Sequence, residues 1–243
     1  MLAPRSEASY RAVAAPVPSA LRLEGVSKTY RREGVPVEAL RGVDLQIGRG
    51  EFVAIMGRSG SGKSTLLHIL GLLDTEYEGR YYLDGIQVSG QSADALSPLR
   101  NRMIGFVFQS FHLLPQLSIL ENAELPALYA RDRDPGVCRG AARERLEQMG
   151  LGDRLDHRPG ELSIGQRQRA GIARALVNNP RVLLADEPTG ALDSRTAEEI
   201  LEILHGLHDS GATLVMVTHD PEVAAVASRI IQIRDGQAHD GVA

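Results

Sequence analysis

A glycine-rich segment, Gly57–Ser64 (GRSGSGKS), contains the residues whose types and spacing have the clearest chemical use. Glycines let a backbone wrap closely around an anion, and successive amides at a helix N-terminus stabilise phosphate oxygens. In such a loop Lys63 reaches the β- and γ-phosphates of a nucleotide, and the hydroxyl of Ser64 ligates magnesium. We therefore predict a phosphate-binding loop (P-loop) whose nucleotide-binding residues are Gly57, Arg58, Ser59, Gly60, Ser61, Gly62, Lys63, Ser64 and Thr65.

Two adjacent carboxylates, Asp186 and Glu187, follow a run of four apolar residues, Val182–Ala185. The run predicts a buried strand, and the carboxylates would stand where that strand leaves the sheet. In P-loop enzymes an aspartate at this place helps to hold magnesium, and Glu187 would orient or deprotonate an attacking water. A solvated turn after a core strand has the same pattern, but the P-loop upstream favours the catalytic interpretation.

A third segment, Leu162–Gln166 (LSIGQ), begins a predicted helix. Ser163 is a natural N-cap, and the free amides and partial positive charge at such a helix start suit a phosphate. A capped helix without a ligand would give the same pattern from these residues alone. The helix should extend roughly 22 Å and the next strand roughly 16 Å, so the helix start is expected to project beyond the sheet toward a partner.

Short apolar runs alternate with helical patterns along the chain, which predicts a mostly parallel sheet covered by helices. The first two runs are expected to pair antiparallel, because Glu24–Gly25 and 32–34 have turn chemistry and no helical crossover. The predicted strands are Leu21–Val26, Val37–Ile47, Phe52–Met56, Ile104–Phe108, Val182–Ala185, Thr213–Thr218 and Ile230–Arg234. The predicted helices are Lys63–Leu72, Arg139–Met149, Ser163–Val177 and Arg195–Asp209, the last with a buried face of Ile200, Ile203, Leu204 and Leu207.

Residues 21–237 are expected to form one domain. The strand signal vanishes between Ser110 and Gly160, where prolines interrupt a helical and polar stretch. We therefore predict that residues 110–160 are a helical insertion in the α/β core. Residues 1–20, rich in Ala and Pro, predict a disordered leader, and residues 238–243 a short tail.

The composition excludes several classes of protein. A net charge of −4 and a pI of about 6.0 argue against a chain whose main task is gripping nucleic acid. Cys138 is the only cysteine, which excludes an intramolecular disulfide and suits a reducing compartment. The longest stretch without acidic or basic side chains, Met103–Leu120, is broken by polar residues and is a poor membrane span. These observations predict a soluble chain.

The P-loop, LSIGQ and Leu183–Pro188 (LLADEP), in this order, resemble the motifs of ATP-binding cassette (ABC) ATPases, and the resemblance covers about Leu21 to Gln237. It implies an α/β fold: a P-loop NTPase (RecA-like) core with an N-terminal antiparallel β subdomain and a helical insertion subdomain. It also implies hydrolysis of ATP to ADP and phosphate with Mg²⁺. The working form would be a head-to-tail homodimer that sandwiches two ATP molecules, with the P-loop of one subunit facing the LSIGQ of the other.

Four more residues gain a role from this resemblance. Tyr30 matches the aromatic residue that stacks on adenine, and Gln109 matches the glutamine that senses magnesium and links to the insertion. His219 matches the histidine that contacts the γ-phosphate, and Asp193 matches the loop across the dimer seam. The implied catalytic set is Glu187, His219 and Gln109; the magnesium set is Ser64, Gln109 and Asp186; the residues facing the partner's ATP include Ser163, Gly165 and Gln166.

One position departs from the family pattern. The family's signature usually reads LSGGQ, and here Ile164 replaces the first glycine. Ser163 and Gly165 remain to supply the hydroxyl and the amide that face phosphate, but a β-branched residue restricts the backbone beside them. We expect a shifted ATP affinity or hydrolysis rate, and not an inactive site.

Further segments resemble the ATPases of macrolide-export and lipoprotein-release systems: Phe106–Gln109, His112–Pro115, Glu121–Asn122, Leu125–Pro126, Thr218–Ala225 and Ile233–Gly236. The resemblance implies an ATP-binding subunit that powers a separate transmembrane permease from the cytoplasmic face of the bacterial inner membrane. An envelope-spanning export partner would complete such a system, and no nucleic acid is expected. Candidates for the permease-docking surface are Phe111, Leu113, Leu114 and Leu117, although packing of the insertion explains them equally well.

Two other classes of function stay open. One is an ABC protein that drives cell-envelope or cell-wall remodelling through a membrane partner without moving a substrate. The other is a soluble ABC ATPase acting on DNA or ribosomes, which usually has a coiled-coil insertion or two fused cassettes; this sequence shows neither. The i,i+3 pair His205 and His208 suggests a solvated helix face more than a metal site, because no third ligand is evident. The run Arg167–Arg174 is interpreted as ion pairing and packing on the signature helix.

Overall fold

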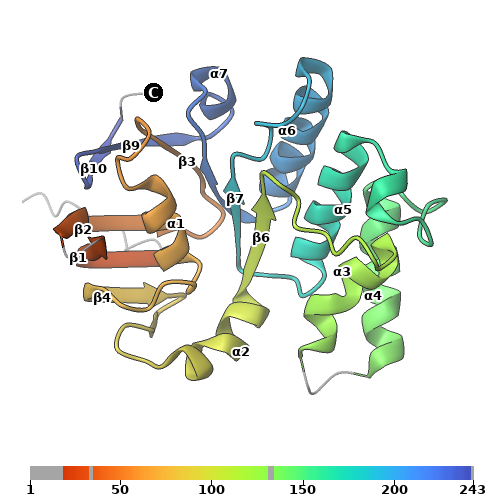
Figure 1. Ribbon diagram of the computed structural model, residues 1–243, viewed down its shortest axis with the longest axis horizontal. Helices are drawn as coiled ribbons and strands as arrows, with labels where there is room; N and C mark the ends of the chain where they lie inside the picture. The colour runs from red at the N-terminus through yellow and green to blue at the C-terminus, as the bar shows by residue number, and fades with distance from the viewer. Residues whose placement is uncertain (1–18, 33–34, 131–133, 242–243) are drawn as a thin grey trace, which may run out of the picture.

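The computed structural model describes residues 19–32, 35–130 and 134–241, which form an α/β fold on two sheets (Figure 1). The larger sheet has the strand order β10-β9-β3-β8-β7-β6. Neighbouring strands from β9 to β6 pair parallel, and β10 pairs antiparallel with β9. Its strands are β3 (Phe52–Met56), β6 (Ile104–Phe108), β7 (Val182–Asp186), β8 (Thr213–Val217), β9 (Arg229–Arg234) and β10 (Gln237–Asp240). The predicted core strands are confirmed to within a residue at each end, and β10 is an addition.

The smaller sheet is antiparallel, with the order β2-β1-β4-β5. It consists of β1 (Ser19–Arg32), β2 (Val35–Gly48), β4 (Glu78–Leu83) and β5 (Ile86–Gln87). The predicted antiparallel pairing of the first two strands is confirmed. The turn predicted at Glu24–Gly25 is wrong. The register between β1 and β2 shifts between Leu23 and Val26, and Gly25 has a φ of +60°, so β1 continues through these residues with an irregularity in the ladder.

Strand pairing also moves the edges of the predicted leader and tail. Ser19 pairs with Gly48 and Ala20 is buried, so both belong to β1. At the other end, residues 238–240 pair with β9 as part of β10. The remainder of the predicted leader, residues 1–18, and residues 242–243 lie outside the described residues.

The helices begin at residues that can cap them. Asp193 accepts a hydrogen bond from the first turn of α6, and Ser118 and Glu121 form a capping box at the start of α3. The predicted helices are confirmed with small changes of boundary, whereas α2 and α7 were not predicted. The helices are α1 (Lys63–Leu70), α2 (Ala93–Met103), α3 (Ile119–Leu128), α4 (Pro135–Gln148), α5 (Ile164–Leu176), α6 (Ser194–Asp209) and α7 (Pro221–Ala224), with a 3₁₀ turn η1 (Pro159–Glu161).

The segment 110–160 is helical, as predicted: it contains α3, α4 and the start of η1, and its described residues include no strand. Figure 1 shows α3 and α4 beside α5, at the opposite end of the molecule from the antiparallel sheet. Within the described residues, no helix is long and apolar enough to cross a membrane.

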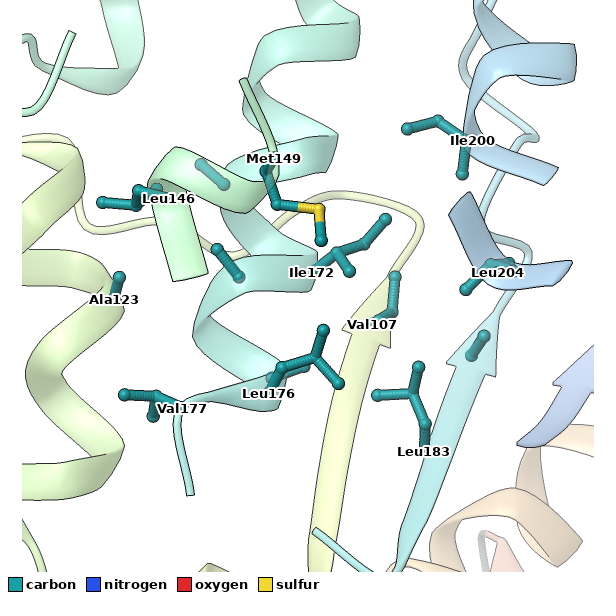
Figure 2. Packing of buried hydrophobic residues seen from close by; sticks show 14 of the residues in the cluster. Val107, Ala123, Leu146, Met149, Ile172, Leu176, Val177, Leu183, Ile200 and Leu204 are labelled. Atoms are coloured by element: carbon teal, nitrogen blue, oxygen red, sulfur yellow. The ribbon is translucent and has the colours of Figure 1, made fainter. Parts of the chain in front are cut away.

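The central strands β3, β7 and β8 of the six-stranded sheet are buried on both faces, which is why they are short and almost entirely apolar runs. Side chains alternate along each strand: Leu183 faces one apolar cluster, and Leu184 faces the other. The first cluster joins the sheet to α3, α4, α5 and α6, and Figure 2 shows Val107 and Leu183 of the sheet against side chains of these helices. The second joins it to α1 and the antiparallel sheet. The predicted buried face of α6 is confirmed, with Ile200 and Leu204 fully buried and Ile203 and Leu207 packed beside them.

Candidate functional site

The P-loop joins β3 to α1, as the sequence predicts. Gly62 is the N-cap of α1 and has a left-handed φ of +110°. A Cβ atom there would lie 2.5 Å from the carbonyl oxygen of Ala39, so a side chain would meet both backbone strain and a collision with β2. The residue before Gly62 is braced by the β9–β10 turn, where the Gly236 amide donates to the Ser61 carbonyl at 3.2 Å. Both sheets therefore hold the loop in shape.

The ammonium group of Lys63 lies inside this loop. Its Nζ donates to the carbonyl oxygens of Gly57, at 2.8 Å, and Arg58, at 3.0 Å. These bonds hold the positive charge of Lys63 beside the glycine-rich backbone, where it would stabilise a bound anion.

Asp186 and Glu187 stand at the carboxyl end of β7, as predicted. Burial raises the pKa of Asp186, and the neighbouring Glu187 carboxylate raises it further, while His68 and Lys63 act in the opposite direction. Glu187 has a φ of +46°, in the left-handed region that a non-glycine residue rarely adopts. Its amide donates to the Val217 carbonyl at 2.9 Å, and its own carbonyl accepts from the Gly190 amide at 3.1 Å. The backbone around Glu187 is thus held in a strained conformation by its neighbours, a feature that clusters at functional sites.

Glu187 contacts His219, which follows β8. The Oε1 atom of Glu187 lies 2.7 Å from Nδ1 of His219. This hydrogen bond, with the charge of Glu187, raises the pKa of His219 above its ordinary value. The Glu187 side chain is 16% exposed and that of His219 is 72% exposed. A carboxylate with little access to water is therefore paired with a histidine at the pocket rim.

Gln109, the first residue after β6, approaches the turn that follows Glu187. A Cβ atom on Gly190 would lie 2.8 Å from Nε2 of Gln109, so the absence of a side chain at Gly190 makes room for Gln109. Gly190 is a residue that the sequence prediction missed. Its φ is not left-handed, and only the approach of two segments distant in sequence explains why glycine stands there.

One open pocket of about 440 Å³ gathers most of the predicted nucleotide and catalytic residues. The predicted residues that line it are Tyr30, Ser59, Gly60, Gly62, Lys63, Ser64, Thr65, Gln109, Asp186, Glu187 and His219. Ala39 and Val217 complete the lining and were not predicted. We call this space the nucleotide pocket. Its hydroxyl, carboxylate and amide oxygens from Ser64, Asp186 and Gln109 are the donor types that Mg²⁺ prefers, so these residues fit the predicted ion. Among the described residues there is no cluster of three or more His, Cys, Asp or Glu side chains that could hold a metal.

Tyr30, the predicted adenine platform, lies at the edge of this pocket in a small network. Its hydroxyl donates to Oδ2 of Asp74 at 2.9 Å, and the buried Lys28 donates to Oδ1 of the same carboxylate at 2.8 Å. The Lys28 ammonium also lies 4.8 Å from the centre of the Tyr30 ring. Burial, more than any other cause, raises the pKa of Tyr30, and the hydrogen bond from Lys28 helps to lower that of Asp74. Neither Lys28 nor Asp74 was predicted as a neighbour of Tyr30. Lys28 could have been noticed in the sequence, because it stands two residues before Tyr30 in the same strand.

The signature segment Leu162–Gln166 lies outside this pocket. Ser163 and Gln166 form a capping box: the Gln166 amide donates to Oγ of Ser163 at 3.3 Å, and the Ser163 amide donates to Oε1 of Gln166 at 2.9 Å. Gly165 is buried, and a Cβ atom there would lie 2.4 Å from Cγ2 of Thr196 in α6. Close packing of α5 on α6 therefore requires this glycine, whichever ligand its amide meets.

Ile164, the departure from the family pattern, is the first residue of α5 and is 45% exposed. It has no left-handed φ, and the cap of the helix is intact beside it. The isoleucine therefore adds an apolar side chain to an exposed helix start without changing the backbone. Asp193 is also exposed; its two oxygens accept hydrogen bonds from the Thr196 amide and hydroxyl, which lower its pKa.

The comparisons with known proteins agree with this arrangement. The sequence pattern of the ABC transporter family matches residues 40–190, from β2 to the turn after Glu187. This chain belongs to the ABC transporter family. Within that family its fold is that of the ATP-binding cassette.

Similar proteins cover the cassette over most of its length. It is 54% identical, over 89% of its residues, to the macrolide export ATP-binding/permease protein MacB of Brucella melitensis, and it spans 33% of that protein. The chain thus corresponds to about a third of the length of this relative. It is 52% identical to an uncharacterized ABC transporter ATP-binding protein of Thermotoga maritima, covering 89% of this chain and 92% of that protein.

Two solved structures have the same fold as the cassette. One is a dimeric post-hydrolysis state of the ATP-binding cassette MJ0796 bound to ADP and phosphate, with a TM-score of 0.83, 45% identity, and 91% and 97% of the two chains covered. The other is a dimeric structure of MJ0796, described as a bacterial ABC transporter cassette, with a TM-score of 0.82, 46% identity, and 90% and 96% covered.

The segment after Gln109 is anchored to α5 of the cassette. Arg174 donates to the Phe111 carbonyl at 2.7 Å, and the Arg167 guanidinium lies 5.6 Å from the Phe111 ring. Burial lowers the pKa of Arg174. These arginines bond to main-chain carbonyls, so the packing interpretation of the arginine run is correct, and for these two the carbonyls take the place of the predicted ion pairs. Of the proposed docking residues, Leu114 is exposed, and Phe111, Leu113 and Leu117 are half-buried.

Proposed function

We propose that the cassette hydrolyses ATP in the nucleotide pocket with Mg²⁺, as a head-to-tail homodimer that powers a transmembrane permease. The observation that carries the catalytic part is the contact between Glu187 and His219 in the same pocket as the P-loop. A carboxylate with little solvent access, placed across from a phosphate-binding loop, is suited to accept a proton from an attacking water.

Each pocket residue has a role in this proposal. The loop amides and Lys63 hold the phosphates, and Tyr30 supports the base. Ser64, Asp186 and Gln109 would hold a magnesium ion, which would neutralise charge that develops on the phosphates. Glu187 takes the proton of the water through its carboxylate, and His219, bonded through Nδ1 to Glu187, fixes the direction in which that carboxylate points.

The dimer part of the proposal rests on the separation of two sets of residues. Ser163, Gly165 and Gln166 stand outside the nucleotide pocket, at the start of α5, where Ser163 and Ile164 are exposed and the helix dipole is positive. A second copy of the chain, placed head to tail, would bring this helix start to the phosphates of its neighbour. The dimeric state of the two similar MJ0796 structures supports this arrangement.

The permease part rests on the relatives. Several relatives are named macrolide export ATP-binding/permease proteins, so their names combine an ATP-binding part with a permease. This chain matches about a third of the length of one such protein. We propose that a separate permease of the export or lipoprotein-release type binds the cassette at the cytoplasmic face of a bacterial inner membrane. Phe111, Leu113, Leu114 and Leu117 are proposed contacts, and an envelope-spanning export partner is a further proposed component.

Replacing Glu187 with Gln tests the catalytic core. The amide cannot accept the proton, so we expect ATP turnover to fall about 100-fold or more while ATP binding persists. The variant should accumulate as a dimer when ATP and Mg²⁺ are added, seen by size-exclusion chromatography. Glu198→Gln on the exposed side of α6 is the matched control and should hydrolyse ATP like the native chain. Fast hydrolysis by Glu187→Gln would remove Glu187 from this role.

The partner is tested separately, by purifying the tagged chain from membranes of cells that express the adjacent genes. Recovery of a permease, with an efflux or lipoprotein phenotype on deletion, supports transport. Recovery of cell-wall hydrolases would instead favour envelope remodelling. Stimulation of ATP turnover by DNA would contradict both.

A further inference from the structure

Gln168 is a buried polar residue in α5 for which the proposed mechanism so far has no use. Its side chain is 0% exposed. Its Nε2 atom donates to the carbonyl oxygen of Pro188 at 2.8 Å, and within the described residues its Oε1 atom has no hydrogen-bond partner. A buried amide oxygen without a partner costs free energy, which a packing role alone would avoid by using an apolar side chain.

The chemistry of the contact fixes which way the amide points. The Pro188 carbonyl can only accept a hydrogen bond, and proline has no N–H to offer Oε1 in return. The donor end of the Gln168 side chain must therefore face Pro188. In the described residues this bond is the only side-chain hydrogen bond that Gln168 makes.

Pro188 follows Glu187 directly, in the turn that joins β7 to α6. We call residues 187–193 the catalytic turn. Glu187 is kept at a φ of +46°, and left-handed backbone of this kind costs about 1–3 kcal/mol unless its surroundings hold it. Main-chain bonds to Val217 and Gly190 hold Glu187 itself, and the bond from Gln168 holds the next peptide.

Helix α5 contacts the catalytic turn or its flank at two points. At the helix start Gly165 packs against Thr196, whose amide and hydroxyl donate to the carboxylate of Asp193 at the end of the catalytic turn. One turn further along, Gln168 reaches Pro188. The helix that carries Ser163 thus contacts the turn that carries Glu187, and a displacement of α5 would be transmitted to the peptide beside the carboxylate.

We propose that Gln168 is a positioning residue that orients the carboxylate of Glu187 in its own subunit, through the hydrogen bond from its Nε2 atom to the Pro188 carbonyl. This inference rests on the proposed catalytic role of Glu187. Gln168 does not line the nucleotide pocket, so it acts on the hydrolysis step and not on the binding of ATP.

The first test compares two substitutions. Gln168→Leu removes the donor and should lower kcat about tenfold with KM for ATP unchanged. Gln168→Glu removes the donor only while the new carboxyl is ionised, since the protonated acid can donate to Pro188. Burial raises the pKa of that carboxyl, so the kcat of Gln168→Glu, relative to the native chain at the same pH, should recover as the pH falls. The Leu variant should show no such recovery.

Controls separate positioning from loss of folding. Gln148→Leu and Gln148→Glu make the same changes on the exposed face of α4 and should leave kcat unchanged. Thermal unfolding of each variant gives the folded fraction at each pH, and kcat is compared per folded molecule. A normal kcat for Gln168→Leu, or a rise in KM with kcat unchanged, would overturn the proposal.

Mixed dimers test whether Gln168 acts within its own subunit. A Gln168→Leu subunit paired with a Glu187→Gln subunit leaves one working carboxylate, that of the Gln168→Leu subunit, and should be slow. A subunit with both substitutions, paired with a native one, leaves only the native carboxylate and should match the native/Glu187→Gln dimer. Equal losses in the two pairs would overturn the proposal.

The reference measurements keep this test distinct from the proposed function. If the native chain fails to hydrolyse ATP, or Glu187→Gln hydrolyses it fast, the proposed catalytic core is wrong. If these references behave as expected and Gln168→Leu equals its control, the core stands and only the role of Gln168 is wrong.

Discussion

The nucleotide pocket draws its side chains from β1, α1 and the ends of β6, β7 and β8, whereas the signature segment presents one turn of one helix. In the pocket, residues distant in sequence already contact one another, as Glu187 and His219 do. At the start of α5, the only hydrogen bonds that the side chains of Ser163 and Gln166 make to described residues are those of their own capping box. The residues of the nucleotide pocket are thus brought together by the folding of one chain, while the signature segment remains at an exposed surface. This difference is what a site shared between two chains requires.

Removing the positive charge from the nucleotide pocket, while the signature segment stays intact, should have the largest effect. Lys63→Ala deletes an ammonium group that would bond to phosphate, and hydrogen bonds to charged groups contribute about 1.5–3 kcal/mol. We expect ATP binding to the isolated chain, measured by calorimetry, to weaken about 10- to 100-fold. Arg143→Ala on the exposed face of α4 is the control. Unchanged affinity in Lys63→Ala would mean that the pocket is not the nucleotide site.

A smaller effect should come from the pH dependence of the Glu187–His219 pair. Because the pKa of His219 is raised above its ordinary value of 6.5, the histidine keeps its proton to a higher pH than a free imidazole would. Protonated His219 holds Oε1 of Glu187 in a charge-assisted hydrogen bond that competes with the attacking water for this oxygen, so kcat should rise as the pH increases through the raised pKa of His219. His219→Gln should lose this titration in the pH profile of kcat, along with part of its activity.

The same pair gives a stability prediction with a definite sign. Because the folded-state pKa of His219 is raised, its contribution is fully present below the unfolded value and is lost as the pH rises through the folded value. The native chain should therefore unfold at a higher urea concentration than His219→Gln. This difference between the two chains should be larger at pH 5.5 than at pH 8.5. The difference will be small because the histidine is exposed. An equal gap at both pH values would contradict the pairing.

The smallest expected effect concerns Ile164 and the exposed region. The isoleucine leaves the helix cap unchanged, so Ile164→Gly should not alter ATP binding by the isolated chain. It should change ATP-driven dimerisation and turnover by about two- to fivefold, the range of a partly exposed apolar side chain at a contact. Analytical ultracentrifugation with ATP in the Glu187→Gln background measures this. If dimerisation and turnover both stay the same, Ile164 is neutral.

The sequence predicts the nucleotide pocket better than it predicts the elements around it. The P-loop, β3 and β6 follow from continuous apolar runs and glycine spacing, and the structure places them as expected. By contrast, β10 (QAHD) has no apolar pattern, because its strand character comes from pairing with β9. In β4 only Tyr81 and Leu83 are buried, so its alternation is too short to stand out.

Residues whose importance depends on contacts between distant segments were also beyond prediction. Gly190 is explained only by the approach of Gln109, and Gly165 needs Thr196 beside it in addition to any ligand. Gln168 lies in the arginine-rich run Arg167–Arg174, which is interpreted from the sequence as ion pairing and packing; this interpretation gives Gln168 no role of its own, and the structure buries it completely. Periodicity reports which face of a helix is buried, but not which carbonyl a buried amide will meet.

The division of labour between the two regions can be tested by mixing two inactive variants. Lys63→Ala disables the pocket, and Ser163→Arg blocks the signature segment. In a head-to-tail dimer of one of each, one ATP site combines the intact pocket of the second variant with the intact signature segment of the first. We expect that ATP turnover, absent in either variant alone, returns on mixing and is highest near equal amounts. If the mixture stays as inactive as its components while both variants remain folded, the two regions do not serve ATP across a shared seam.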